Sequence, residues 1–219
     1  DLLGFGPSDT GSMASVFRDI ASVAADDGIV FDPASVRVGV IRKDAGYGGV
    51  RVTLNGKLAN ARCVAQVDVG FGDAVTPGPT DAVYPVLLDD LPAPRLRTYP
   101  VYTVVAEKLH AIVVLGMVNS RLKDYLDLVV IMEREALDEP TLALAIAATF
   151  QRRGTALPNA PPVGLSDEFA LDPTRIALWQ SLLKKNDIVH RPLVDVVTVL
   201  RVALWPAVVQ AGALQLSSP

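Results

Sequence analysis

The pattern of apolar residues changes near residue 98, and this change most constrains the fold. Before it, apolar and polar residues alternate in short runs such as 36–42 and 50–54, which is typical of half-buried β-strands. Beyond Tyr99 the apolar residues recur at helical spacing, which predicts helices over 101–115, 120–135, 139–153, 172–185 and 192–211. The sequence therefore predicts an α+β protein, with a mixed or antiparallel sheet domain over residues 1–97 and an all-helical domain over residues 98–219.

Two short signals in the first half predict local structure. Ser12 is a suitable N-cap for a helix over about 13–25, in which Val16, Ile20 and Val23 share one apolar face. Asn55-Gly56 lies between alternating segments and predicts a β-hairpin turn at that point.

Composition excludes several classes of protein. Half of the 219 residues are hydrophobic, but the apolar runs are interrupted too often to predict a membrane span. Cys63 is the only cysteine, which excludes an intramolecular disulfide and favours a cytoplasmic location. The net charge of −4 disfavours a general nucleic-acid coat and leaves room for a local basic patch. With two histidines, any metal is expected to be held by carboxylates, which favours Mg²⁺ or Mn²⁺.

Charged residues interrupt the apolar faces of two predicted helices. Lys108 lies in the first of these helices, and Arg121, Lys123, Asp124 and Asp127 lie in the second. Each charge taken singly fits a surface role, as a lysine whose stem lies on apolar surface or as an ion pair within one helix. Their density within apolar helices favours a site held on rigid elements.

The first half contributes carboxylates at the ends of strands. Asp68 ends an apolar strand just before Gly70-Phe71-Gly72, and Asp1 precedes the apolar residues Leu2-Leu3. Asp68 either presents a functional carboxylate at the rim of the sheet or binds turn amides, and the residues alone favour neither. Two strand-end carboxylates that share divalent cations, faced by Lys and Arg, would suit phosphoryl or nucleotidyl transfer.

These motifs together resemble a known family. Ala106-Glu107-Lys108-Leu109-His110-Ala111 and Arg121-Leu122-Lys123-Asp124-Tyr125-Leu126-Asp127-Leu128 are similar to the third and fourth motifs of the AbiEii/AbiGii nucleotidyltransferase toxins. Val67-Asp68-Val69-Gly70-Phe71-Gly72-Asp73 resembles the middle strand of that family, and Asp1-Leu2-Leu3 resembles the end of its Asp-x-Asp motif. The family belongs to the DNA-polymerase-β-type nucleotidyltransferase superfamily.

The resemblance implies a nucleotidyltransferase-type fold and a role for each matching residue. Asp1 and Asp68 would bind the metal, and Asp68, Lys108 and Asp124 would be catalytic. Lys108 would contact the triphosphate, with Arg121 and Lys123 as further phosphate contacts. The reaction would move a nucleotide from a nucleoside triphosphate to an acceptor with the help of Mg²⁺ or Mn²⁺.

The resemblance also implies partners and a physiological role. In several relatives the acceptor is the 3′ end of tRNA and the outcome is arrested growth, so we expect a toxin–antitoxin or abortive-infection toxin with its antitoxin encoded nearby. An RNA acceptor would need basic residues gathered on one face. The candidate pairs are Arg95 with Arg97, Arg152 with Arg153, and Lys184 with Lys185.

One departure from the family pattern opens alternatives. The Gly-Gly or Gly-Ser turn and the first Asp of Asp-x-Asp are absent from these 219 residues. We therefore expect an N-terminally truncated sheet domain. The alternative functions are a catalytically inactive or truncated relative that serves as a binding module, and a helical interaction module with no nucleotide role.

Overall fold

The computed structural model describes residues 2–42, 48–88 and 90–216. The chain forms two compact units. The sheet unit comprises Asp1–Asp73 with Val86–Pro92, and the helical unit comprises Ala74–Pro85 with Ala93–Pro219.

The sheet unit is built on two long antiparallel strands, β4 (Gly48–Leu58) and β5 (Ala61–Phe71). On its other edge, β4 pairs antiparallel with both β2 (Ile29–Phe31) and β3 (Arg37–Arg42). The short strand β1 (Leu2–Gly4) lies parallel to β5. The sheet is therefore mixed, as predicted.

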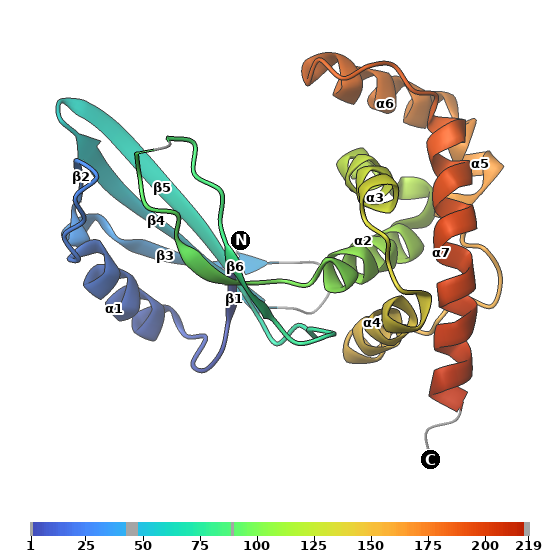
Figure 1. The fold of residues 1–219 in the computed structure, drawn as a ribbon, viewed down its shortest axis with the longest axis horizontal. Coiled ribbons are helices and arrows are strands. Elements are labelled where there is room, and N and C mark those ends of the chain that lie inside the picture. Colours follow the sequence, from blue (N-terminus) through green and yellow to red (C-terminus); the bar gives the residue numbers. More distant parts are fainter. Residues whose placement is uncertain (1, 43–47, 89, 217–219) are drawn as a thin grey trace. The chain divides into compact units, whose positions relative to one another are not determined.

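Helix α1 (Thr10–Ala21) covers one face of this sheet (Figure 1). Its buried residues, Phe17 and Ala21, form a small core with buried residues of the neighbouring strands. Asp9 caps this helix, and its Oδ1 accepts a 2.8 Å hydrogen bond from the backbone N–H of Ser12. The predicted cap at Ser12 is therefore three residues too late. The predicted apolar face is also wrong, because Val16, Ile20 and Val23 are exposed.

The prediction of a turn at Asn55-Gly56 is also wrong, because both residues lie inside β4. The hairpin turns at Ala59-Asn60 instead, where Ala59 has a positive φ of 50°. A Cβ on Gly56 would lie 2.8 Å from Sγ of Cys63 and 2.9 Å from Cδ1 of Phe31. Glycine is needed here for close packing against β2 and β5, and not for a turn.

A two-stranded ribbon of β6 (Thr80–Val83) and β7 (Arg95–Thr98) groups with the helices. The division into compact units therefore differs from the predicted boundary near residue 98. The predicted strand over 83–88 begins earlier and ends at Val83, and the predicted linker over 91–100 contains β7. A 3₁₀ helix, η1 (Pro33–Ser35), lies in the sheet unit.

The helical unit agrees closely with the predicted ranges. Helix α2 has the predicted bounds, and the other long helices begin and end within a few residues of theirs. The elements are α2 (Val101–Leu115), η2 (Gly116–Val118), α3 (Leu122–Arg134), α4 (Glu139–Arg152), η3 (Val163–Leu165), α5 (Asp167–Ala170), α6 (Pro173–Lys185) and α7 (Leu193–Leu216). Pro206 lies inside α7, which runs beyond the predicted end at residue 211.

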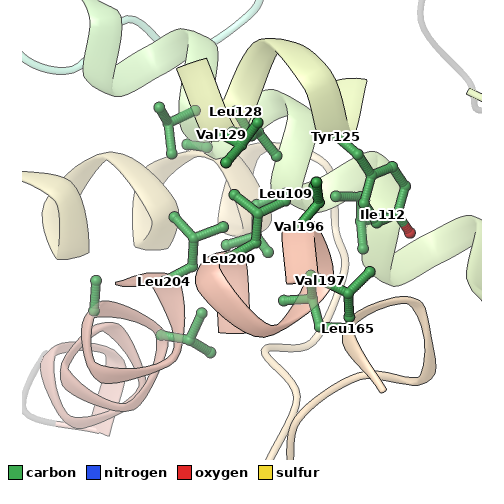
Figure 2. Close-up of a cluster of buried hydrophobic side chains, with 14 of the residues drawn as sticks. Leu109, Ile112, Tyr125, Leu128, Val129, Leu165, Val196, Val197, Leu200 and Leu204 are labelled. Carbon is green, nitrogen blue, oxygen red and sulfur yellow. The ribbon is translucent and has the colours of Figure 1, made fainter. Parts of the chain in front are cut away.

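The core of this unit lies where α2, α3, η3 and α7 meet, and Figure 2 shows side chains from all four. Leu109, Leu128, Val196 and Leu200 are fully buried there. By length and composition, Val101–Val118 and Leu193–Gln215 are apolar enough to cross a membrane. Core helices of globular proteins have the same property, and both segments supply buried residues to this core. The structure thus has the predicted α+β architecture, a mixed sheet followed by helices.

Candidate functional site

The charged residues of α2 and α3 meet in one cluster in the helical unit. Nζ of Lys108 on α2 donates to Oδ1 of Asp124 and to Oδ2 of Asp127 on α3, each at 2.8 Å. The spacing of three residues places both carboxylates on the same side of α3. Lys108 therefore joins the two helices through both carboxylates at once.

Arg121 completes the cluster from the N-cap position of α3. Its Nε lies 2.8 Å from Oδ2 of Asp124, so each oxygen of that carboxylate faces a cation. Asp124 is only 5% exposed, whereas the side chain of Arg121 is 60% exposed. A carboxylate so deeply buried is stable as an anion only when it is paired in this way.

Asp127 was not among the predicted site residues, although the sequence places it on the same helix face as Asp124. Its side chain is 33% exposed, more than that of Asp124. The signal that identifies it is an aspartate three residues after Asp124 in an otherwise apolar helix. Asp127 therefore orients the ammonium of Lys108 from the more solvent-exposed side of the cluster.

The charge state of Lys108 follows from these contacts. Burial lowers the pKa of the Lys108 ammonium, but the hydrogen bonds and charges of Asp124 and Asp127 outweigh it and raise the pKa above its usual value. Lys108 is therefore protonated at neutral pH. Two of its three N–H bonds serve the aspartates, which leaves one donor for another ligand.

Asn119 and Arg175 hold the start of α3. Asn119 is fully buried, and its Oδ1 accepts a 2.8 Å hydrogen bond from the backbone N–H of Arg121. Nη1 of Arg175, on α6, donates to the backbone carbonyl of Asn119 at 2.8 Å. These two residues orient the first turn of α3, which carries Arg121 and Asp124.

Gly164 in η3 fixes the packing of α2 against α3. A Cβ at this position would lie 2.7 Å from Cγ2 and 2.9 Å from the carbonyl oxygen of Ile112 on α2. It would also lie 3.0 Å from the hydroxyl of Tyr125 on α3, which donates to the carbonyl of Gly164 at 2.8 Å. Ile112 and Tyr125 lie side by side in Figure 2, and the close approach of Gly164 to both fixes the relative position of the two helices that carry the cluster.

His110 lies two residues from Lys108 in a second polar group. It is 6% exposed, and its Nδ1 accepts from Nη1 of Arg153 at 3.3 Å while its Nε2 contacts Oγ1 of Thr155 at 2.9 Å. Burial, and then the charge of Arg153, lower the pKa of His110 to about 4. Arg153 also lies 3.6 Å from Oε1 of Glu107. His110 is therefore neutral at physiological pH and acts as an anchor between α2 and α4.

Asp68, the predicted strand-end carboxylate, belongs to the sheet unit. Its Oδ1 and Oδ2 accept from Nε and Nη2 of Arg51 on β4, at 2.8 and 2.7 Å. The side chain of Asp68 is 26% exposed, and the partnership raises the pKa of Arg51. Asp68 was expected either to present a functional carboxylate at the rim of the sheet or to bind turn amides. Neither expectation included the ion pair with Arg51.

The predicted metal site can be tested against these contacts. Asp1, its other predicted ligand, lies outside the described residues. Within residues 2–42, 48–88 and 90–216, no group of three His, Cys, Asp or Glu side chains is placed to hold a metal ion. The carboxylates of Asp68, Asp124 and Asp127 are each paired with a cation. As they stand, these described carboxylates do not fit a metal ion.

The remaining predicted residues fall outside the cluster. Lys123 is exposed and forms no ion pair with any described residue. Of the basic pairs, Arg153 is occupied by Glu107 and His110, whereas Arg95, Arg97, Lys184 and Lys185 are exposed. The structure therefore brings Lys108, Arg121 and Asp124 together, and it adds Asp127.

Comparison with known families agrees with the motifs that form this cluster. Residues 1–202 match the family model described as nucleotidyl transferase AbiEii toxin, type IV toxin–antitoxin system. No match was found among curated proteins. The matched region includes both the sheet unit and the cluster on α2 and α3, and the chain belongs to the AbiEii nucleotidyl transferase toxin family.

Proposed function

We propose that this protein transfers a nucleotide from a nucleoside triphosphate to an RNA acceptor, such as the 3′ end of tRNA, as the toxin of a type IV toxin–antitoxin pair. The family supports nucleotidyl transfer and a cognate antitoxin. The observation that carries the proposal is the ammonium of Lys108, which two aspartates orient at 2.8 Å while one N–H stays available. The proposal includes a cytoplasmic location and an antitoxin encoded nearby.

The geometry suits the binding of phosphate more than proton transfer. Formally, Lys108 and Arg121 balance Asp124 and Asp127, so the cluster carries no excess positive charge. Affinity for a triphosphate must then come from directed hydrogen bonds, which the third N–H of Lys108 and the exposed terminal nitrogens of Arg121 can supply. Lys123, on the exposed side of α3, is a further predicted phosphate contact.

The reaction replaces the bond between the α-phosphorus and the pyrophosphate oxygen by a bond from the α-phosphorus to a hydroxyl oxygen of the acceptor. Pyrophosphate and a proton leave. A fixed ammonium stabilises the charge that develops on the phosphate oxygens, at no cost of reorganisation during the reaction. Dependence on Mg²⁺ or Mn²⁺ is part of the proposal. Asp1 and Asp68 are the predicted ligands, and Asp68 would have to release Arg51 in order to bind the ion.

The proposal is tested with labelled triphosphates and total tRNA. We expect metal-dependent incorporation of label by the protein, and a loss of at least about a hundredfold in Lys108→Ala, the magnitude for removal of one transition-state donor. The control is Arg18→Ala, which removes an exposed basic residue of α1 and should keep full activity. A protein inert toward all four triphosphates, in the presence of Mg²⁺ or Mn²⁺, would contradict it.

A second candidate function is a non-catalytic binding module. It is favoured by the bidentate pairing of Asp68 with Arg51, since this pairing competes with any metal for the carboxylate. Calorimetry separates the two functions. A binding module would take up triphosphate or RNA without consuming the triphosphate, and it would bind equally well without a divalent cation.

A further inference from the structure

The sheet presents a polar face on the side opposite α1. Strand register places Arg51, Thr53, Asn55 and Lys57 of β4 on one face, because the intervening residues Val50, Val52 and Leu54 are buried on the other. Their partners on β5 belong to the same polar face. These partners are Asp68, Gln66, Val64 and Arg62 respectively, and Arg37 of β3 lies opposite Thr53.

Four basic side chains form a strip on this face, here called the basic strip: Arg37, Arg51, Lys57 and Arg62. Among the described strand residues that point to this side, Asp68 alone is acidic, and it is paired with Arg51. The basic strip stands out because the whole chain carries a net charge of −4. It extends from Arg51 to Lys57 along β4, a length of about 20 Å.

Most cations of the basic strip have no acidic partner. Lys57 forms no hydrogen bond or ion pair with any described side chain, and Nη2 of Arg62 donates only to Oδ1 of Asn55, at 3.3 Å. Nη1 of Arg37 donates to the backbone carbonyls of Ala34 and Val36. Arg37, Lys57 and Arg62 are all exposed. Three positive charges are therefore available to an anionic ligand.

The pairing of Lys57 with Arg62 is unfavourable in the free protein. These two residues lie directly opposite each other across β4 and β5. Like charges at directly opposed positions destabilise a sheet, and a neutral or acidic residue at either position would remove the repulsion. An anion bound between the two side chains would be attracted to both cations and would offset their repulsion.

The face is also hollowed beside the strip. A depression of about 380 Å³ lies next to Arg37 and is lined by Asp32, Ser35, Thr53, Asn55 and Val64. Its volume falls within the range of small-molecule sites, and its hydroxyl and amide groups can bind sugar or base edges. A row of cations beside a polar hollow suits a phosphodiester strand better than a single compact anion.

We propose that this face of the sheet binds the RNA acceptor, with Arg37, Lys57 and Arg62 contacting successive phosphates along the strand. The proposal rests on the proposed function only for the identity of the strand as the acceptor. The basic strip covers about 20 Å, which is enough for several phosphates of a single strand. Binding itself is measurable without any transfer of nucleotide.

The experiment measures fluorescence anisotropy of a labelled single-stranded RNA with the full chain, in the absence of triphosphate, at a series of salt concentrations. The double variant Lys57→Ala/Arg62→Ala is compared with Arg18→Ala/Arg134→Ala, which removes the same charge from exposed positions near the ends of α1 and α3. We expect the first variant to bind at least about tenfold more weakly, with a salt slope smaller by about 1.4, since each lost phosphate contact removes roughly 0.7 on a single strand. The second should bind like the unmodified protein.

Three other outcomes overturn the inference. Equal weakening in both variants would mean that only net charge matters, and an unchanged affinity in the first would exclude the strip. Binding of poly-glutamate in place of RNA, with loss in the first variant, would assign the face to an acidic protein partner. A protein that binds RNA through the strip but transfers no nucleotide would contradict the proposed function alone.

Discussion

Nζ of Lys108 on α2 and Oδ1 of Asp124 on α3 lie 2.8 Å apart, and the carboxylate of Asp124 is almost completely buried. This ion pair joins two helices that also share one apolar core. It follows that the pair has a structural role in the helical unit as well as the proposed role in phosphate binding. The two roles can be separated by mutation.

Lys108→Met is expected to destabilise the protein by about 2 kcal/mol, because it leaves Asp124 buried with Arg121 as its remaining cation. The double variant Lys108→Met/Asp124→Leu should recover most of this loss, since replacing both partners by apolar residues removes the buried charge. Urea unfolding measures both effects. Nucleotide transfer should be absent from the single and the double variant. If Lys108→Met unfolds like the unmodified protein, the pair is not a structural link.

Asn119→Ala is expected to lower kcat for nucleotide transfer with little change in the KM for triphosphate. The substitution removes the acceptor for the N–H of Arg121, so the first turn of α3 loses its fixed orientation. Arg175→Met should act in the same direction, because it removes the donor to the carbonyl of Asn119. Each should cost about 1 kcal/mol of stability.

Asn186→Ala is the matched control for these variants. Its amide nitrogen donates to the carbonyl of Leu182 at the exposed end of α6, far along the chain from the cluster. We expect a similar small loss of stability and an unchanged kcat. If Asn186→Ala lowers kcat as much as Asn119→Ala, general loss of stability explains both results and the positioning role fails.

Much of the helical unit could be predicted because its signals are local. Asp172 followed by Pro173 starts α6 as predicted, with Oδ1 of Asp172 accepting from the N–H of Arg175. Lys108, Arg121 and Asp124 were predicted to act together, and they do meet. The support from Asn119 and Gly164 was not predictable, because it depends on contacts between segments distant in the sequence.

The partner of Asp68 was missed for a specific physical reason. Strand register follows from the position of the turn, and a turn at Asn55-Gly56 would place Arg51 opposite Asn60. The actual turn at Ala59-Asn60 places it opposite Asp68. A glycine that is needed for close packing and a glycine that is needed for a turn can have the same neighbours in the sequence. The sequence pattern therefore could not distinguish the two cases. The basic strip was missed for the same reason.

Gly164→Ala is expected to cost at least about 2 kcal/mol, because its Cβ would press on the backbone and side chain of Ile112 in a well-packed region. Gly212→Ala is the matched control. Gly212 lies inside α7 with nothing within 4 Å of the added Cβ, so alanine should stabilise the protein by about 0.5–1 kcal/mol. Thermal unfolding of both variants tests the pair. A neutral Gly164→Ala would show that α2 and α3 can shift apart without cost.

The stability of the protein is expected to fall as the pH falls from about 6.5 to about 4, in part because of His110. Its folded-state pKa of about 4 lies below the ordinary value of 6.5, so the unfolded chain binds a proton in this range that the folded protein does not. The stability tied to His110 is thus complete above pH 6.5 and is lost as the pH falls toward 4. The maximum loss from this residue is about 3 kcal/mol.

His110→Gln removes the titrating group and should flatten the dependence of the unfolding free energy on pH in this range. The amide can still accept from Arg153 or donate toward Thr155, which limits the other effects of the substitution. His190→Gln, at an exposed position, is the matched substitution for comparison. Urea unfolding at pH 7, 6, 5 and 4.5 gives the comparison. Parallel curves for His110→Gln and the unmodified protein would show that His110 is not held neutral in the fold, because an imidazole that titrates equally in both states contributes no pH dependence.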